Sequence, residues 1–205
     1  MFAGIVEALG LMRQGLAGSA GGLSLQVPDG LRQRLRVGDS LAVNGCCLPV
    51  VQLDPRGVVA DVMPETARRT TLAGLAAGAA VNCEAALAFG APVGGHLLSG
   101  HVDAVGRIAA RRPEGNAVRL TIAVPPAVLR YCVAQGSLAV DGCSLTLAAV
   151  EAETVAVALI PHTLAVTVAG AYAVGTEVNL EADLLGKYVE RLLEPHRAAA
   201  GRAGS

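Results

Sequence analysis

The chain repeats one block of sequence, and this duplication limits what it can fold into. The segment SLAVNGCCL at 40–48 returns as SLAVDGCSL at 137–145, PET at 64–66 returns as PHT at 161–163, and VNCE at 81–84 returns as VNLE at 178–181. Each of these pairs is separated by 97 residues, and the opening blocks GIVEALG and GHVDAVG by 96. Such a period is the length of a small domain and exceeds the roughly 20- to 50-residue units of solenoids. We therefore expect two copies of one domain, at 1–96 and 97–183, followed by a separate segment at 184–205.

The charge of the chain points away from nucleic acid and membrane surfaces as partners. Lys and Arg number 16 against 17 Asp and Glu, which gives a net charge of −1, and no basic run stands out. The first residues lack the basic segment of a signal peptide, and the Ala/Gly-rich stretch at 72–94 is interrupted by Asn82 and Glu84. We expect a cytoplasmic protein that binds a small neutral or weakly acidic ligand.

The cysteines and histidines show no spacing typical of a disulfide framework or a metal site. The five cysteines are Cys46, Cys47, Cys83, Cys132 and Cys143, and no C-x-x-C pair occurs among them. The four histidines do not group with them as ligands. We expect reduced thiols and no metal.

Within each repeat, short runs of Val, Leu, Ile and Thr are separated by Gly, Pro, Asn and Asp, which is typical of an all-β domain. Asn44-Gly45 and Asp141-Gly142 each stand between apolar runs, and both dipeptides favour tight hairpins because they tolerate positive φ. Several strands at this spacing predict a small barrel or sandwich in each half.

The C-terminal segment is the exception, because its apolar residues recur with helical spacing. They are Leu184, Leu185, Tyr188, Val189, Leu192 and Leu193, and we expect the helix to end near Pro195. Two roles are open for this helix. It either covers its own domain or packs against the same helix of other copies, which would give a trimer.

No familiar catalytic motif occurs, so the candidate residues come from differences between the repeats. The first repeat has Ile5, Asn44, Cys47, Pro49 and Glu65 where the second has His101, Asp141, Ser144, Thr146 and His162. His101 is a candidate for proton transfer because imidazole titrates near neutral pH, although a lone histidine is also often structural. Cys47 is either a nucleophile or a small buried hydrophobic residue.

Several blocks of the chain resemble the riboflavin synthase alpha-chain family. They are MFAGIVE at 1–7, NGCCL at 44–48, MPET at 63–66, GGHLLSGHVD at 94–103, DGCSLT at 141–146, IPHT at 160–163 and VNLE at 178–181. The resemblance runs from residue 1 to about 193. It implies an all-β fold of two tandem six-stranded Greek-key β-barrels with a C-terminal α-helix, and a homotrimer. It also allows an association with the lumazine synthase that supplies the substrate.

The resemblance further implies an activity. Two molecules of 6,7-dimethyl-8-ribityllumazine exchange a four-carbon unit to give riboflavin and 5-amino-6-(ribitylamino)uracil, without a cofactor or metal. In this family the first barrel of one subunit faces the second barrel of its neighbour. Relatives that only bind lumazine or flavin provide the alternative function, that of a carrier.

The resemblance also implies roles for residues. It assigns proton transfer to His101, places Ser40 and Cys47 near the reacting atoms, and gives Phe2 a part in shaping the pocket. The implied ligand contacts in the first half are Gly4, Ile5, Val6, Cys47, Leu48, Pro49, Asp61, Val62, Met63, Pro64, Glu65 and Thr66. Those in the second half are Gly100, His101, Val102, Gln135, Ser144, Leu145, Thr146, Ala158, Leu159, Ile160, Pro161, His162 and Thr163. The chain departs from the family at Pro49, commonly Thr, and at Gln135, commonly Lys.

Overall fold

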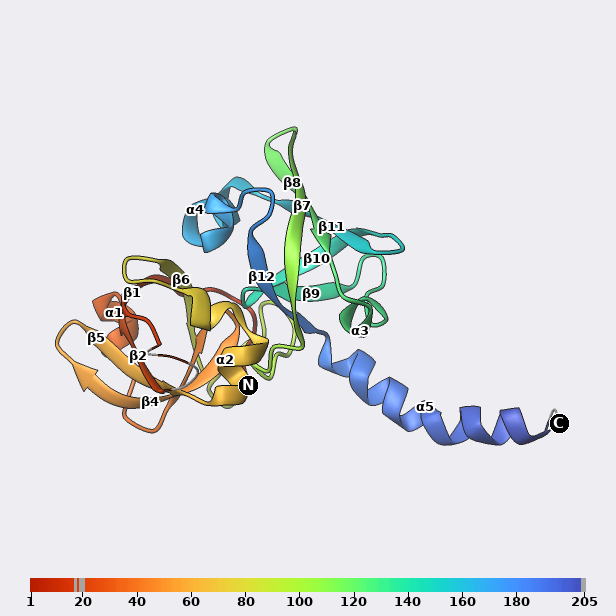
Figure 1. Ribbon diagram of the computed structural model, residues 1–205, viewed down its shortest axis with the longest axis horizontal. Helices are drawn as coiled ribbons and strands as arrows, with labels where there is room; N and C mark the ends of the chain where they lie inside the picture. Colours follow the sequence, from red (N-terminus) through yellow and green to blue (C-terminus); the bar gives the residue numbers. More distant parts are fainter. Residues whose placement is uncertain (17, 19–20, 204–205) are drawn as a thin grey trace.

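The computed structural model describes residues 1–16, 18 and 21–203, and it shows two β-barrels followed by one long helix (Figure 1). The strands of the first barrel are β1 (Ala8–Gln14), β2 (Gly21–Gln26), β3 (Ser40–Val43), β4 (Cys46–Asp54), β5 (Gly57–Val62) and β6 (Ala80–Ala85). They close in the order β1-β2-β5-β4-β3-β6. β2 thus pairs with β5 rather than with β3, which is a Greek-key connection.

The second barrel repeats this arrangement. Its strands are β7 (Ala104–Glu114), β8 (Ala117–Ala123), β9 (Ser137–Val140), β10 (Cys143–Val150), β11 (Thr154–Leu159) and β12 (Glu177–Ala182). They close in the order β10-β11-β8-β7-β12-β9, which is the ring of the first barrel when β7 is matched to β1. The prediction of two six-stranded barrels and a C-terminal helix is confirmed.

Short helices connect the strands at matching places in the two barrels. They are α1 (Asp29–Arg32), α2 (Pro64–Arg69), η1 (Thr71–Gly74), α3 (Pro126–Leu129), α4 (Pro161–Val166) and η2 (Val168–Ala171). α2 and α4 begin with proline, whose fixed φ suits the first helical position and whose missing N–H is not needed there. Each barrel therefore has a helix directly after its fifth strand.

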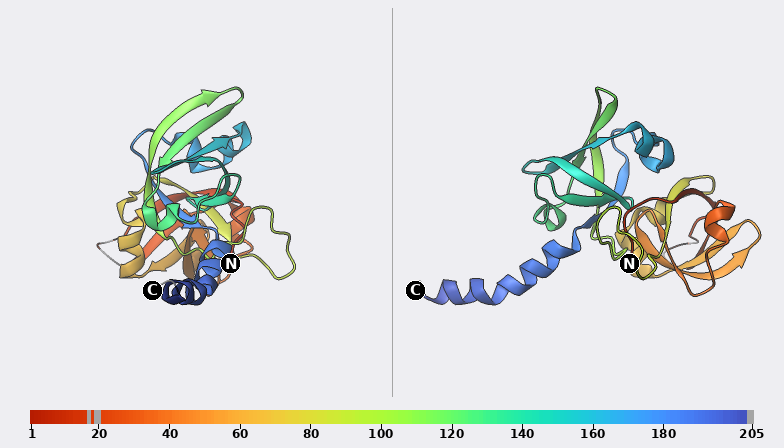
Figure 2. Two further views of the ribbon diagram at one scale, coloured as in Figure 1. Left: turned by 90° about the vertical axis from the view of Figure 1, so that its right-hand side faces the viewer. Right: turned by 180° about the vertical axis from the view of Figure 1, so that it is seen from behind.

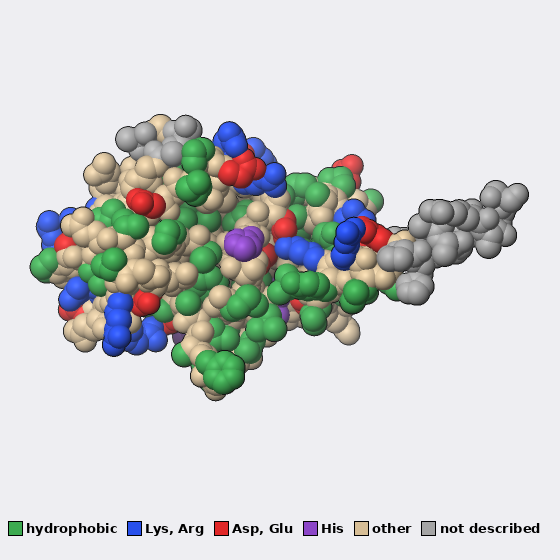
Figure 3. Space-filling view, turned by 90° about the horizontal axis from the view of Figure 1, so that it is seen from below, with side chains coloured by type: hydrophobic (Ala, Val, Ile, Leu, Met, Phe, Trp, Pro, Cys, Tyr) green, Lys and Arg blue, Asp and Glu red, His purple; other side chains and the backbone are tan. Residues whose placement is uncertain are grey.

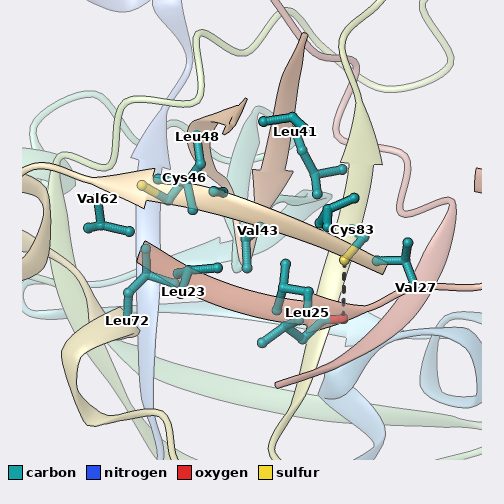
Figure 4. Packing of buried hydrophobic residues seen from close by; sticks show 14 of the residues in the cluster. Leu23, Leu25, Val27, Leu41, Val43, Cys46, Leu48, Val62, Leu72 and Cys83 are labelled. Atoms are coloured by element: carbon teal, nitrogen blue, oxygen red, sulfur yellow. Dashed lines mark hydrogen bonds between the residues drawn. The ribbon is translucent and has the colours of Figure 1, made fainter. Parts of the chain in front are cut away.

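Each barrel encloses its own hydrophobic core. Because alternate residues of a strand point to opposite faces, Leu23 and Leu25 of β2 point into the first barrel together with Leu41 and Val43 of β3 (Figure 4). Full burial of one leucine side chain stabilises a fold by about 1.5–3 kcal/mol. The second barrel has an equivalent cluster. The duplication thus produces two separate cores rather than one shared core.

The barrels meet through their predicted hairpin turns. Asn44 and Gly45 have φ values of 45° and 77°, and Asp141 and Gly142 have φ values of 44° and 75°, so both turns have the positive φ expected from sequence. The turns lie against one another. A Cβ atom on Gly45 would lie 2.6 Å from the backbone nitrogen of Gly142, and one on Gly142 would lie 2.7 Å from that of Gly45.

Two buried asparagines join the barrels symmetrically around these turns. Asn82 of β6 donates to Asp141 O at 2.9 Å, and Asn179 of β12 donates to Asn44 O at 2.8 Å. Each amide oxygen also accepts a backbone N–H across the interface, Asn82 from Val168 and Asn179 from Thr71, both at 2.8 Å. Because these residues are buried and both the nitrogen and the oxygen of each amide are hydrogen-bonded across the interface, separation of the barrels would leave several polar groups unsatisfied.

The two repeats contribute different side chains to this interface at one position, the amide of Asn44 and the carboxyl group of Asp141. Asn44 Oδ1 accepts Asn82 N at 2.7 Å, and the matching Asp141 Oδ1 accepts Asn179 N at 2.8 Å. The second carboxylate oxygen of Asp141 accepts the Tyr172 hydroxyl at 2.6 Å. Burial raises the pKa of Asp141 to about 7, although its two hydrogen bonds act in the opposite direction.

We predict that Asp141→Asn stabilises the protein at neutral and alkaline pH. The folded wild type holds a proton on Asp141 up to about pH 7, whereas the unfolded chain loses it near pH 4. The stability that this group contributes is therefore lost as the pH rises from about 4 to 7. The variant should gain about 4 kcal/mol over the wild type above pH 7 and almost nothing at pH 4.

Urea unfolding of both proteins between pH 4 and 8 measures this difference. Asn44 shows that an amide fits the equivalent place, and the Tyr172 hydroxyl can accept a hydrogen bond as well as donate one. A constant difference in unfolding free energy across this range would contradict the prediction.

α5 (Leu184–Ala203) leaves the second barrel and extends away from both barrels (Figures 1 and 2). Its first turns are attached to the body of the protein. Lys187 forms an ion pair with Asp103, and Glu190 accepts bonds from Arg130 and Tyr131. The expected end near Pro195 was wrong, because a proline removes one helical hydrogen bond but does not have to end the helix.

The described surface agrees with the near-neutral charge. In the described part of the face in Figure 3, basic and acidic groups are interspersed with hydrophobic side chains. Among the helices that the structure describes, none combines the length and the apolar character that crossing a bilayer requires. All five cysteines are free thiols, as the sequence predicted.

Candidate functional site

A pocket forms in the first barrel where β4 and β5 separate. β4 pairs with β3 from Cys46 onward but with β5 only from Val50, so the start of β4 has one free edge. Backbone N–H groups alternate in direction along a strand, and Val50 N bonds to Asp39 O on the β3 side. The backbone nitrogens of Cys47 and Pro49 therefore point to the free edge.

This cavity of about 350 Å³, called the first pocket below, has walls from both repeats. It is lined by Cys46, Cys47, Glu65, Thr66, Arg69, Thr70, Gly100, His101, Val102 and Asp103. Residues 100–102 follow the linker between the barrels and dock on the free edge of β4, where Cys47 N donates to Gly100 O at 2.8 Å. His101 and Cys47, far apart in sequence, therefore line one pocket.

The second barrel has the same arrangement, but the segment that docks on it comes from the first repeat. β10 pairs with β9 at its start but joins β11 only further along. The free edge of β10 is occupied by the N-terminal segment, since Ser144 N donates to Gly4 O at 2.8 Å. We call the surface formed by residues 4–6, Ser144, Thr146 and residues 161–163 the second pocket.

The sequence analysis placed each candidate ligand segment with the other segments from its own half of the chain, and the structure corrects this for two segments. Residues 4–6, expected with Cys47 of the first half, lie on the second barrel. Residues 100–102, expected with Ser144 of the second half, lie on the first barrel. The reason is that each segment docks through backbone hydrogen bonds to the other barrel, and such bonds leave no trace in the residue types.

Phe2 and Ser40 lie beside the first pocket rather than in its lining. Phe2 is 1% exposed and belongs to a small cluster between the barrels that contacts Cys47. A Cβ atom on Gly100 would lie 2.8 Å from the Phe2 ring, so this ring supports the segment that carries His101. Ser40 of β3 is half-buried and stands opposite Pro49.

The other predicted contact residues divide by their orientation. Leu48, Val62, Leu145 and Leu159 are buried in the barrel cores, so only their backbone groups are free to meet a ligand. The exposed ones at the ends of β5 and β11 or in the helices that follow are Asp61, Met63, Pro64, Ala158, Ile160, Pro161 and His162. Gln135 is exposed in the turn before β9 with a φ of 65°, in the other barrel from Cys47.

Four residues that line the first pocket were not predicted from the sequence: Cys46, Arg69, Thr70 and Asp103. Arg69 and Thr70 lie shortly after the PET motif, separated from it by Ala67 and Arg68, and Arg69 donates a hydrogen bond to Glu65. Asp103 binds Lys187 Nζ at 2.7 Å and thereby connects α5 to this pocket. The signal for Asp103 was its place in the same block as His101, whereas nothing in the pattern predicted its partner.

His96, which was not among the predicted site residues, contacts Ser144 of the second pocket. Its Nδ1 lies 2.6 Å from Ser144 Oγ, and its backbone N–H donates to Ala3 O at 3.1 Å. Burial lowers the pKa of this imidazole, which favours its neutral form. His96 therefore holds the hydroxyl of Ser144 without adding a charge beside it.

The cysteines around the two pockets differ in burial. Burial raises the pKa of Cys46 to about 12 and that of Cys143 to about 11, so both thiols stay protonated at neutral pH. Both side chains belong to the barrel cores. Cys47 is half-buried and lines the first pocket, which leaves it as the cysteine placed to meet a ligand there.

Comparison with known families gives a match over both repeats. A model of the family described as "Lumazine binding domain" matches residues 3–86 and again residues 99–183. These two ranges contain the two barrels. The family match therefore follows the same duplication as the sequence and the fold.

Several curated proteins named riboflavin synthase are similar to the chain over nearly its whole length. The one from Mycobacterium bovis is 46% identical over 199 residues, covering 94% of this chain and 98% of the relative. Those from Bacillus subtilis and Schizosaccharomyces pombe are 39% and 37% identical, covering 97% of this chain and 91% and 96% of the relative. Among solved structures, LumP complexed with riboflavin has a TM-score of 0.82 at 23% identity, covering 89% of this chain and 99% of that one. That likeness shows the fold.

Proposed function

This chain belongs to the riboflavin synthase family and is an enzyme of the transferase class, and from that premise we propose that it catalyses the dismutation of 6,7-dimethyl-8-ribityllumazine. One lumazine would donate a four-carbon unit to a second, giving riboflavin and 5-amino-6-(ribitylamino)uracil. The observation that carries this proposal is the meeting of Cys47 and His101 in one pocket, and the matching bond from Ser144 N to Gly4 O on the other barrel supports it.

The chemistry requires three things of the protein. A proton must leave the C7 methyl group of one lumazine, a nucleophile must add to the other, and the two rings must be held in contact. Holding the rings together accounts for most of the rate, because effective molarities in such pairs reach roughly 10⁵–10⁸ M. A general acid or base adds about 10²- to 10⁴-fold. We assign proton transfer to His101 and place Cys47 and Ser40 near the reacting atoms.

Incubation of the purified protein with the lumazine as the only organic substrate tests this function. Riboflavin fluorescence should rise until the lumazine is consumed, with one riboflavin formed for every two lumazines. The alternative is a carrier of the same fold, and the relatives named riboflavin synthase, at 37–46% identity, favour the enzyme over it. Tight binding of lumazine without formation of riboflavin would establish the carrier.

We propose further that the enzyme is a cytoplasmic homotrimer in which the first pocket of one subunit faces the second pocket of its neighbour. The support is a hydrophobic stripe along α5 whose members are 50–70% exposed: Leu185, Tyr188, Val189, Leu192 and Leu193. Such a stripe would be buried by the same helix of other copies. An association with the lumazine synthase that supplies the substrate also stays a prediction.

Charged substitutions in this stripe test the trimer. Removal of α5 would also remove Lys187, which binds Asp103 in the first pocket, so it would not separate assembly from the site. Val189→Asp with Leu192→Asp keeps that contact. This variant should sediment as a monomer, bind lumazine and form riboflavin at least about tenfold more slowly.

Glu194→Ala, on the other side of the helix, is the matched control and should keep both assembly and rate. A fully active monomer would contradict the shared site. Unchanged sedimentation of the double variant would contradict the role of the stripe.

Because Pro49 lacks an N–H and a hydroxyl, we predict that lumazine binds the first pocket more weakly than the second. The nitrogen at position 49 points to the free edge of β4, where proline offers no N–H and no hydroxyl, whereas its counterpart Thr146 offers both. We expect Pro49→Thr to tighten the first pocket by about 1 kcal/mol, the usual net value of one hydrogen bond. Titration of the full chain with lumazine measures this gain. The prediction is refuted if the weaker site has the same affinity in the wild type and in Pro49→Thr.

A further inference from the structure

Two buried carboxylates hold the exchanged segments that complete the pockets. Glu84 of β6 accepts the backbone N–H groups of Ala3 at 2.6 Å and Gly4 at 3.1 Å. Glu181 of β12, at the matching place, accepts Ser99 N at 2.7 Å and Gly100 N at 3.1 Å. The two side chains belong to residues that are only 6% and 3% exposed.

Each segment therefore touches both barrels. Gly4 is held by Glu84 of the first barrel, while its carbonyl accepts Ser144 N of the second. Gly100 is held by Glu181 of the second barrel, while its carbonyl accepts Cys47 N of the first.

The contacts of these segments leave no spare room. A Cβ atom on Gly4 would lie 2.7 Å from Ser144 Cβ, and one on Gly100 would lie 2.5 Å from Cys47 Cβ. Both glycines also have positive φ, 72° and 78°, which disfavours any other residue. A small displacement of either segment is thus transmitted directly to the pocket that it completes.

We propose that each glutamate positions the ligand site of the barrel to which it does not belong: Glu181 controls the first pocket and Glu84 the second. Glu181 orients Gly100 and His101 over the free edge of β4, and Glu84 orients residues 4–6 over the free edge of β10. The inference rests on the proposed function only because lumazine is the ligand whose binding to the pockets is measured.

The chemistry of the carboxylate explains why glutamate stands at these positions. Both oxygens of each side chain accept a hydrogen bond, and bonds to an ionised acceptor are about twice as strong as those between neutral groups. Glutamine has the same shape but presents an NH₂ group in place of one oxygen, so it would face one backbone N–H with a donor. Glu181→Gln and Glu84→Gln thus weaken the hydrogen bonds to a segment while keeping the volume of the side chain.

The experiment measures lumazine binding by the full chain with one pocket blocked. Thr163→Trp closes the second pocket, and the matching Thr66→Trp closes the first. Glu181→Gln should weaken lumazine binding about tenfold where only the first pocket is open and by less than twofold where only the second is open. Glu84→Gln should show the reverse.

The outcome separates positioning from a merely structural role. A structural defect would weaken the pocket on the barrel that carries the substitution, or both pockets equally, and either result would overturn the proposal. Ser99→Ala is the milder variant, because it keeps Glu181 and both of its bonds from backbone N–H groups. It removes the 2.7 Å bond from the Ser99 hydroxyl to Glu181 and the 3.3 Å bond that this hydroxyl accepts from His101 N, and it should weaken the first pocket in the same direction.

Hydrogen exchange gives a readout that does not depend on the ligand. Glu181→Gln should speed exchange of the Cys47 amide, which donates to Gly100 O, and leave that of Ser144 unchanged. Faster exchange at Ser144 alone would refute the proposal. If wild-type protein binds no lumazine, the proposed function fails, and these exchange rates still decide the inference.

Discussion

Replacement of His101 with alanine should lower the rate of riboflavin formation by about 10²-fold or more and leave the affinity for lumazine within a few fold. The imidazole lines the first pocket together with Cys47, and its backbone is fixed by the bond from Cys47 N to Gly100 O. General acid–base catalysis acts on the transition state more than on the bound substrate, so kcat should fall while binding persists. Steady-state kinetics and equilibrium titration with lumazine measure the two quantities separately.

His162→Ala is the matched control for this experiment. His162 is an exposed histidine on the second barrel, in the segment that forms the second pocket. Its loss should change the rate by less than about tenfold, because proton transfer is assigned to the first pocket. An unchanged rate in His101→Ala would make His101 a structural residue, and equal losses in both variants would remove the distinction between the pockets.

Replacement of Gly142 with alanine should destabilise the protein by about 2–5 kcal/mol. Part of this cost is the left-handed backbone conformation, with φ at 75°, which costs an alanine roughly 1–2 kcal/mol. The remainder is steric, because the new methyl group would lie 2.7 Å from the backbone nitrogen of Gly45 in the other barrel. Denaturant unfolding of the two proteins measures the difference.

Gly78→Ala separates the two contributions. Gly78 also has a positive φ, 86°, but a Cβ atom there would meet nothing within 4 Å. This control should therefore lose only the roughly 1–2 kcal/mol of backbone strain. Equal losses in the two variants would show that the contact between the turns is not tight. Gly45→Ala should behave as Gly142→Ala does, because the two turns meet symmetrically.

The local patterns of the sequence predicted an all-β domain in each half, either a barrel or a sandwich, and the resemblance between motifs added that it is a barrel. Strand alternation, turn dipeptides and the 97-residue repeat are encoded in residues close together in the chain, and the structure follows them at Asn44-Gly45 and Asp141-Gly142. That the two turns would meet could not be read from the sequence. Any Asn-Gly or Asp-Gly turn has the same local signal whether it faces solvent or another barrel.

The sequence predicted many of the residues of the candidate site but not which of them come together in one pocket. His101, Cys47, Glu65 and Thr66 were each predicted as site residues and lie together in the first pocket, although His101 was grouped with the second half of the chain. Arg69 and Thr70 line the same pocket and were not predicted, because they follow the PET motif on the same helical turns without any signature of their own.

The sequence by itself determined that the chain forms two like barrels, each with a tight hairpin, a core and a set of candidate ligand segments. The tertiary structure alone decided which barrel each segment serves. The contacts that exchange the segments join backbone groups, Cys47 N to Gly100 O and Ser144 N to Gly4 O. Because every non-proline residue carries the same N–H and C=O, such bonds leave no mark on residue type, and only the packed fold shows where they form.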